Sequence, residues 1–434
     1  MAALFLGGTE KVGSYGAEID LGIPAEWMPV RVAGGCGPNW DVTEAIRAIR
    51  GLVNRYHADV VIDLSDEPVL DPRRRMQLAA HVLHSGVEYE GADFRFWPPP
   101  RPVLANRPSI AIIGTGKRIG KTSVSGEVAR ILTAAGRTPV VVAMGRGGPP
   151  EPVVVEAGRT LDAAALLEIA DAGGHAASDF YEDAVTSGVA TVGARRCGGG
   201  LAGAVGSSNA AQAIRAANQL PGDLLLLEGS GAAIPPANAD ATILVVPGYC
   251  DPELMLGYLG AYRILLADLV AVTMCESPRS SPTQVEAVLE AIRSISRRVV
   301  VLRTVLRPVP LGPVCGAKVF FATTAPTSVT AVLAAYLQER YDCEVVATSS
   351  RLANRPALRA DLGRAGAFDV LLVELKAAAV DVAARAAAAV GARMVVCDNR
   401  PIVVGPVGET EAEEAFSSVV RAVAGQAEAR FVEI

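Results

Sequence analysis

Nine residues, GTGKRIGKT at positions 114–122, constrain the fold of this 434-residue chain more than any other stretch. They follow the apolar run SIAIIG and precede a helical pattern that extends to about residue 135. A buried strand, a glycine-rich turn and Gly-Lys-Thr at the start of a helix present backbone N–H groups to phosphate oxygens. The stretch therefore predicts a phosphate-binding loop in an α/β protein with a mostly parallel sheet.

The glycine spacing of this loop departs by one residue from the common pattern. That pattern has Gly six positions before the lysine, where this chain has Thr115, and the glycine is instead Gly114. We expect Lys121 to reach the β- and γ-phosphates of ATP and the Thr122 hydroxyl to bind Mg²⁺. The full set of expected ATP contacts is Gly114, Thr115, Gly116, Lys117, Arg118, Ile119, Gly120, Lys121 and Thr122. A turn that only joins strand to helix is the alternative.

Composition excludes several classes of protein. Half of the chain is hydrophobic and a fifth is charged, as in folded globular proteins. The net charge of −6 argues against a nucleic-acid partner, so any anionic ligand must be met by local groups of Arg and Lys. No charged-apolar-small leader and no long apolar run is present, so we expect neither secretion nor a membrane partner. Seven scattered cysteines without a Cys-x-x-Cys pair favour a cytoplasmic location.

Two proline-rich segments, WPPPRPVLANRPS from position 97 and RPVPLGPVCG from position 307, interrupt the alternation of strand-like and helical runs. They predict three parts. Residues 1–105 would form an N-terminal α/β domain, residues 106–312 the central P-loop ATP-binding catalytic domain, and residues 313–434 a smaller C-terminal α/β unit. A homodimer is the default expectation for assembly.

The apolar run LLLLEGSG at positions 224–231 delivers one carboxylate, Glu228, at the end of a buried strand. Mg²⁺ needs an oxygen ligand opposite the Thr122 hydroxyl, so we expect Glu228 to bind the metal. A turn- or helix-capping role is the alternative. Glu151, in the rigid turn MGRGGPPEP at 144–152, is a further candidate metal ligand.

Further strings in the central part supply positive charge and glycine. RRCGGG at 195–200 combines guanidinium forks with backbone N–H groups that an anion can approach closely. An exposed flexible loop is the alternative. The candidate substrate-binding residues are Arg146, His175, Asp179, Arg195, Arg196, Gly198, Gly199 and Gly200.

The string GHAASDFYED at 174–183 leaves more readings open. His175 is either a general base or phosphate ligand, or a structural hydrogen-bonding residue. We expect at least two of Asp179, Glu182 and Asp183 to lie on a solvated helix face. Cys197 has no histidine near it in sequence and is expected to be a small buried thiol.

The loop G-T-x-x-x-[VI]-G-K-T is similar to that of dethiobiotin synthetase, in a P-loop branch that includes the cobyrinic acid amidating enzymes. Those synthetases carry a similar E-G-x-G after a buried strand, where the Glu binds Mg²⁺. Together, GTGKRIGKT, MGRGGPPEP, HAASDFYEDA, GARRCGGG and EGSGAA resemble the cyclic 2,3-diphosphoglycerate synthetase family. The likeness extends to GGTEKVG at 7–13 and DLSDEPVLD at 63–71.

This resemblance implies an ATP-dependent ligase that joins the two phosphates of 2,3-diphosphoglycerate into an internal phosphoanhydride and releases ADP and phosphate. Lys117, Lys121 and Glu228 would then be catalytic, and Lys117 and Arg118 would help to hold the anionic acceptor. Glu10, Lys11, Asp66 and Glu67 would close over the site as a lid, or be surface turns. Family members begin with an additional strand and a short acidic-His segment, so we expect a shorter N-terminal unit here.

Two rival functions remain at this point. One is another ATP-dependent ligase or kinase of the dethiobiotin synthetase branch, acting on a different small anionic acid. An amidating enzyme is disfavoured because a glutaminase needs a Cys-His arrangement and the four histidines all lie at or before position 175. The other is a regulatory GTPase or metallochaperone, which calls for an Asn/Thr-Lys-x-Asp signature where this chain reads VTMCE at 272–276.

Overall fold

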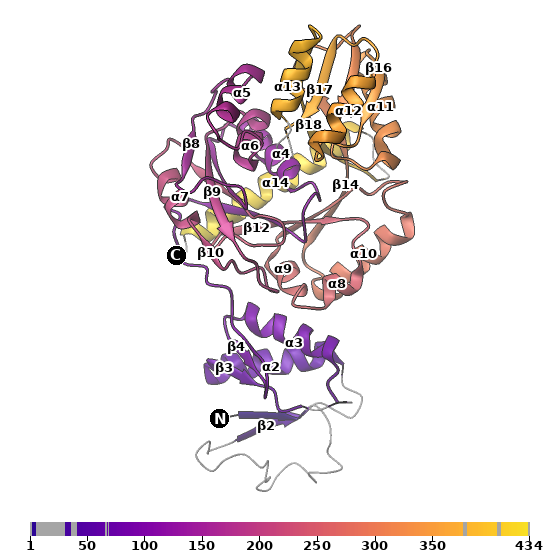
Figure 1. Ribbon diagram of the computed structural model, residues 1–434. Coiled ribbons are helices and arrows are strands. Elements are labelled where there is room, and N and C mark those ends of the chain that lie inside the picture. The colour runs from indigo at the N-terminus through magenta and orange to yellow at the C-terminus, as the bar shows by residue number, and fades with distance from the viewer. Residues whose placement is uncertain are drawn as a thin grey trace. The chain divides into compact units, whose positions relative to one another are not determined.

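The computed structural model describes residues 2–5, 31–35, 41–65, 67, 69–375, 380–405 and 409–432, and the chain divides into two compact units (Figure 1). One unit comprises Met1–Pro99 with Asp251–Leu266, and the other comprises Pro100–Cys250 with Ala267–Ile434. A short segment from the middle of the chain therefore belongs with the N-terminal residues.

In the first unit, β1 (Ala2–Phe5) pairs in parallel with β2 (Arg31–Gly35). A separate small sheet contains β3 (Val60–Ile62), β4 (Glu88–Glu90) and β5 (Arg95–Phe96). The helix α3 (Pro72–His84) contacts α2 (Val42–Tyr56), α8 (Pro252–Leu256) and α9 (Ala261–Leu266). Asp41 and Asp71 cap α2 and α3 by accepting a hydrogen bond from a first-turn N–H, which explains where these helices begin.

The second unit is built on a sheet whose first seven strands are parallel. In spatial order they are β9 (Thr191–Cys197), β7 (Pro139–Gly145), β11 (Leu224–Glu228), β6 (Ser109–Gly114), β12 (Ala241–Pro247), β13 (Leu269–Thr273) and β14 (Val300–Pro310). The short strands β8 (Val153–Val155) and β10 (Ser207–Ser208) pair antiparallel with β9. Five of these strands, β6, β7, β11, β12 and β13, are buried along their whole length, because helices cover both faces and each strand is accordingly apolar.

Two hydrophobic clusters lie on opposite faces of these strands. The larger cluster draws on α4 (Lys121–Ala134), α5 (Ala163–Asp171), α6 (Asp179–Ser187) and α14 (Glu409–Val432). The other cluster includes α7 (Ala210–Ala217), and α10 (Pro282–Ile295) follows β13 along the chain. These helices hold the carboxyl ends of the strands, and the loops that follow them, on one edge of the sheet.

The sheet continues into the C-terminal part of the chain. β14 pairs antiparallel with β18 (Arg393–Val403), which is followed by β17 (Val370–Glu374), β15 (Lys318–Ala322) and β16 (Glu344–Ser349). The helices α11 (Thr327–Tyr341), α12 (Arg355–Arg364) and α13 (Val380–Ala389) connect these strands. The described residues thus form one sheet of 13 strands across this unit. The predicted boundary after residue 312 lies just beyond β14 and stays a prediction.

The last helix, α14, ties the C-terminal part to the central strands. Phe416, Val420 and Val423 belong to the same hydrophobic cluster as residues of α4 and β6. Arg430 also forms an ion pair with Asp268, at 2.7 Å. The predicted α/β class with a mostly parallel sheet is confirmed.

We predict that α14 contributes to stability through its buried face. Val420→Ala removes two methyl groups from a fully buried position and should lower the free energy of unfolding by about 2 kcal/mol. Val432→Ala, the matched change where 83% of the side chain is exposed, should change it by less than about 0.5 kcal/mol. Urea denaturation followed by circular dichroism measures both, and equal effects would show that α14 is not part of the core.

Candidate active site

The phosphate-binding loop lies between β6, which ends at Gly114, and α4, which begins at Lys121. Gly120 caps α4 with a left-handed φ of 87°, a conformation that favours glycine. No side chain caps this helix, and its first turn carries no acidic residue. Its first N–H groups are therefore available to an anion such as phosphate.

Ile119 packs against Gly114, the glycine that begins the loop. A Cβ at position 114 would lie 2.6 Å from Ile119 Cδ1, so a side chain there would displace the buried isoleucine. The Ile119 carbonyl accepts a hydrogen bond of 2.7 Å from Thr273 Oγ1, at the end of β13. Ile119 thus packs on β6 and is hydrogen-bonded to β13, two strands away.

Glu228, at the end of β11, meets the start of α4 as predicted. Its Oε1 accepts a hydrogen bond of 3.1 Å from Thr122 Oγ1 and lies 3.6 Å from Lys121 Nζ. Glu228 is 1% exposed, and its Oε2 is buried without a hydrogen-bond partner. A buried carboxylate oxygen without a donor, next to a threonine hydroxyl, fits a bound Mg²⁺.

A second carboxylate, Asp183 on α6, lies against Glu228. It is fully buried, and no N–H or hydroxyl group of the described residues donates to its oxygens. Burial, then the charge of Glu228 and a hydrogen bond to it, raise the pKa of Asp183 well above its usual range. Glu182 is also buried. The expectation that these two residues lie on a solvated helix face is wrong, because α6 packs against α4, β7 and β9.

Two cationic side chains flank Gly231, three residues after Glu228. A Cβ on Gly231 would lie 3.4 Å from both Lys117 Cγ and Arg196 Nη2. Arg196 is buried, and it donates from Nη2 to the Ser230 carbonyl at 2.8 Å and from Nη1 to the Gly198 carbonyl at 2.6 Å. Its Nε is buried without a partner. Arg196 therefore joins two loops and keeps one donor uncommitted.

The loops after β7 and β9 are held together as well. Arg195 Nε donates to the Gly148 carbonyl at 2.6 Å, and a Cβ on Gly148 would lie 2.0 Å from the Ala194 carbonyl oxygen. Glycine is therefore required at position 148. Burial and the nearby Arg146 lower the pKa of Arg196, so the two guanidinium groups are neighbours.

His175 and Asp179 lie at the same edge. Together with Gly145, Gly147 and Ser178 they line a small cavity of about 60 Å³. His175 Nδ1 lies 3.1 Å from Ser178 Oγ, with the donor set by the ring tautomer. The structure thus gathers the predicted residues of three separate strings around the ends of β7, β9 and β11.

Other predicted residues lie elsewhere or are already engaged. Among the described contacts, none joins Glu151, which is exposed, to Thr122 or Glu228. The Gly200 amide donates to the Ala204 carbonyl, which argues against its expected role as an anion donor. Arg118 and Glu67 are exposed. Cys197 is also exposed, so the expectation of a buried thiol is wrong. Glu10, Lys11 and Asp66 lie outside the described residues.

Asp183 and Thr273 are the site residues that sequence reasoning missed. Asp183 follows Asp179 by four positions, so the two share a helix face, and this spacing was the available signal. Thr273 had no signal, because its contact with the loop depends on β13 lying two strands from β6.

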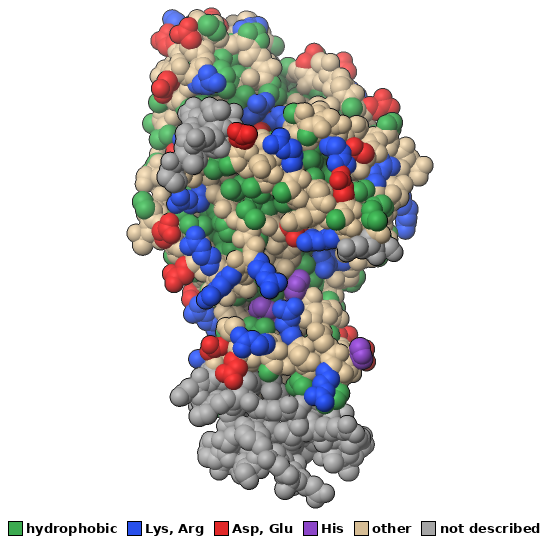
Figure 2. Space-filling model, turned by 180° about the vertical axis from the view of Figure 1, so that it is seen from behind, with side chains coloured by type: hydrophobic (Ala, Val, Ile, Leu, Met, Phe, Trp, Pro, Cys, Tyr) green, Lys and Arg blue, Asp and Glu red, His purple; other side chains and the backbone are tan. Residues whose placement is uncertain are grey.

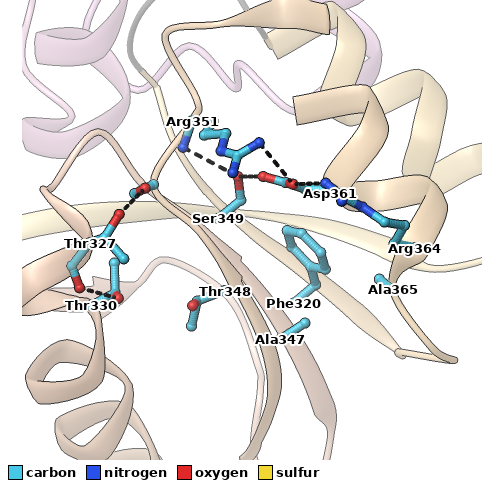
Figure 3. A pocket seen from close by; sticks show the side chains of 11 residues that line it. Phe320, Thr327, Thr330, Ala347, Thr348, Ser349, Arg351, Asp361, Arg364 and Ala365 are labelled. Carbon is cyan, nitrogen blue, oxygen red and sulfur yellow. Dashed lines mark hydrogen bonds and ion pairs between the residues drawn. The ribbon is translucent and has the colours of Figure 1, made fainter. Parts of the chain in front are cut away.

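A larger cavity of about 270 Å³ lies in the C-terminal part, between β15, β16, α11 and α12 (Figure 3). Asp361 accepts hydrogen bonds there from Ser349 Oγ at 2.7 Å and from Arg364 at 2.8 Å. Arg351 Nη1 lies 3.6 Å from the same carboxylate. Two arginines therefore share one carboxylate in this cavity, which lies apart from the phosphate-binding loop in sequence and sheet order.

Two features of the described residues bear on possible ligands. The face in Figure 2 carries Lys and Arg side chains interspersed with Asp and Glu. No helix in the described ranges is long and apolar enough to cross a membrane.

Three family models match the chain. They are described as the cyclic 2,3-diphosphoglycerate synthetase N-terminal domain (residues 1–97), P-loop domain (109–305) and C-terminal domain (310–400). Cyclic 2,3-diphosphoglycerate synthetase of Rubrobacter xylanophilus is 46% identical over 93% of this chain and 88% of its own length. The protein of that name from Methanothermobacter thermautotrophicus is 45% identical, over 98% and 90%.

Among solved structures, LpxK from Aquifex aeolicus in complex with ATP covers 74% of this chain and 90% of its own, with 11% identity and a TM-score of 0.43. That similarity is too low to bear on function. The sequence relatives and the family models agree with the motifs. The chain belongs to the cyclic 2,3-diphosphoglycerate synthetase family, as the sequence predicted.

Proposed function

We propose that the protein is an ATP-dependent ligase that converts 2,3-diphosphoglycerate into its cyclic phosphoanhydride and releases ADP and phosphate. The observation that carries the proposal is the meeting of the phosphate-binding loop, Glu228 and a group of Lys and Arg side chains at one sheet edge. The names of the relatives support the choice of substrate. A substrate with two phosphates and a carboxylate matches this local positive charge in a chain of net charge −6.

The reaction proceeds in two phosphorus–oxygen exchanges. First, an oxygen of one substrate phosphate attacks the γ-phosphorus of ATP, and the bond to the β-phosphate oxygen breaks to release ADP. Second, an oxygen of the other substrate phosphate attacks the substrate phosphorus that carries the transferred phosphoryl group. The cyclic anhydride bond forms and orthophosphate leaves. No protein nucleophile is needed, so the chain contributes positioning and charge stabilisation.

The residues at the start of α4 serve the first exchange. Lys121 and the free N–H groups of the helix N-terminus hold the transferring phosphoryl group. Lys117, on the other side of the loop, faces the acceptor beside Gly231. The buried contact between Lys121 and Glu228 keeps the ammonium group aimed at the loop before nucleotide binds.

The Thr122 hydroxyl and the Glu228 carboxylate would hold Mg²⁺. When bound, the ion neutralises charge on the nucleotide phosphates. Glu151 stays a candidate ligand on sequence grounds.

Three arginines and the glycine-rich loop would hold the acceptor. Arg146 and Arg195 are exposed and present their guanidinium groups to an incoming anion. Arg196 is buried, and two of its nitrogens are used by backbone carbonyls, so its contribution is the Nε donor and the positioning of Gly198. His175 and Asp179, beside the small cavity, would contact the end of the substrate near β7. The cytoplasmic location and the homodimer stay predictions.

Phosphorus NMR of the protein with Mg·ATP and 2,3-diphosphoglycerate tests the proposal. We expect the two phosphomonoester signals to be replaced by those of a cyclic anhydride, with one ADP and one orthophosphate per product. A phosphorylated acyclic product would indicate a kinase. ATP turnover that does not depend on 2,3-diphosphoglycerate would reject this substrate and favour a different anionic acid.

We predict that Lys121→Ala lowers kcat by about 100-fold or more, because a charge-assisted donor to the transferring group is lost. Lys318→Ala is the matched control, since Lys318 is an exposed lysine on β15. It should change kcat by less than about twofold. ADP release measured with a coupled assay gives both values, and an active Lys121→Ala protein would remove the proposed role.

We predict that Arg195→Ala raises the KM for 2,3-diphosphoglycerate by about tenfold while the KM for ATP is unchanged, because one ionic contact to the acceptor is lost. Arg297→Ala, at an exposed position after α10, should change neither constant. Steady-state kinetics with each substrate varied in turn makes the comparison. An equal rise in both constants would point to a general structural defect instead.

A further inference from the structure

Asp183 is a buried carboxyl group to which the proposed reaction gives no role. It is fully buried on α6, and its carboxyl group lies within hydrogen-bonding distance of the Glu228 carboxyl group. Glu228 is 1% exposed. No N–H or hydroxyl group of the described residues donates to either Asp183 oxygen or to Glu228 Oε2. Two buried carboxyl groups therefore meet beside the phosphate-binding loop.

Burying such groups is costly unless an opposite charge or a donor meets them. Lys121 lies 3.6 Å from Glu228 Oε1, and it is a single ammonium group for two carboxylates. The Thr122 hydroxyl donates to the same Oε1. The oxygens left over are thus available to a further cation.

The helix that carries Asp183 is held firmly in place. Arg130 of α4 donates to the Thr186 carbonyl at 2.8 Å, and Gly126 of α4 leaves room for Thr186. The Ser187 hydroxyl donates to the carbonyl of Asp183 itself. None of these contacts uses the Asp183 carboxyl group, which the fold places against Glu228.

Asp183 and Glu228 supply two carboxyl groups, a number that suits Mg²⁺. The described residues contain no cluster of three or more His, Cys, Asp or Glu side chains that could hold a metal alone. Mg²⁺ is usually bound by one or two carboxylates together with substrate phosphates and water. Two carboxylates and a threonine hydroxyl beside a phosphate-binding loop match that requirement.

We propose that Asp183 is a second carboxylate ligand, with Glu228 and Thr122, for the divalent cation that accompanies the nucleotide. This deepens the proposed function, because it concerns the same site. Asp179 is less suited to the role, since its carboxylate lies only partly buried beside Gly145 at the end of β7.

Binding of Mn²⁺, used as the probe for the cation, tests the proposal. Free Mn²⁺ is measured by electron paramagnetic resonance with the full-length protein and a non-hydrolysable ATP analogue. Asp183→Asn should weaken Mn²⁺ binding by about tenfold or more. Glu182→Gln changes the neighbouring buried carboxylate, which has a partner of its own, and should have an effect below about twofold. Wild-type affinity in Asp183→Asn would overturn the proposal.

Urea denaturation supplies the second readout. In the presence of a chelator, Asp183→Asn should unfold at the same urea concentration as the wild type or a higher one, because an amide of the same size can donate to Glu228 in place of the carboxyl group. Addition of Mn²⁺ and the nucleotide analogue should then stabilise the wild type more than the variant. A variant that is unfolded in the chelator would show that Asp183 is structural and would also overturn the proposal.

Neither measurement uses 2,3-diphosphoglycerate. If Asp183→Asn loses Mn²⁺ affinity but the wild-type protein forms no cyclic product, the proposed function is rejected and the ligand assignment stands.

Discussion

The pairing of β11 with β6 is the constraint on which the site depends. Glu228 lies opposite Ile112, and the Gly229 amide donates to the Ile112 carbonyl, so the acid is fixed two residues before the loop begins at Gly114. A slip of one residue would turn the Glu228 side chain to the other face of the sheet. Buried leucines on both faces of β11 prevent that slip, because each face packs into its own hydrophobic cluster. The core therefore sets the position of the metal-side carboxylate.

The strands and the loop of the central part were predictable because their signals are local. A strand buried on both faces must be apolar throughout, so SIAIIG and LLLLE were read correctly, and the start of α4 followed from Gly120 and Lys121. The antiparallel joint between β14 and β18 was not predictable, since it pairs residues that are about ninety positions apart in the chain. The return of α14 to the central core is another long-range contact without a local signal.

The candidate site was only partly predictable for a related reason. The types of residue that meet phosphate were evident from spacing, as for Lys121, Thr122 and Glu228. Burial of Asp183 was not, because an acidic side chain on a helix is normally assigned to solvent. Cys197 shows the converse error, since β9 extends beyond the sheet core and its last residues emerge into solvent. Sequence patterns give little guidance for residues whose burial is unusual for their type, and such residues are often part of functional sites.

The described charges of the site form an acidic group and a basic group that meet at the phosphate-binding loop. The carboxyl groups of Asp183 and Glu228 lie together, and the Thr122 hydroxyl and Lys121 contact Glu228. Lys117 and Arg196 flank Gly231, and Arg146 is close enough to lower the pKa of Arg196. Like charges held together repel unless an opposite charge lies between them. This arrangement therefore favours a cation on the side of α6 and the anionic acceptor on the side of β9, with the nucleotide phosphates at the loop between them. Ligands of opposite charge would relieve both repulsions at once, which couples their binding through electrostatics alone.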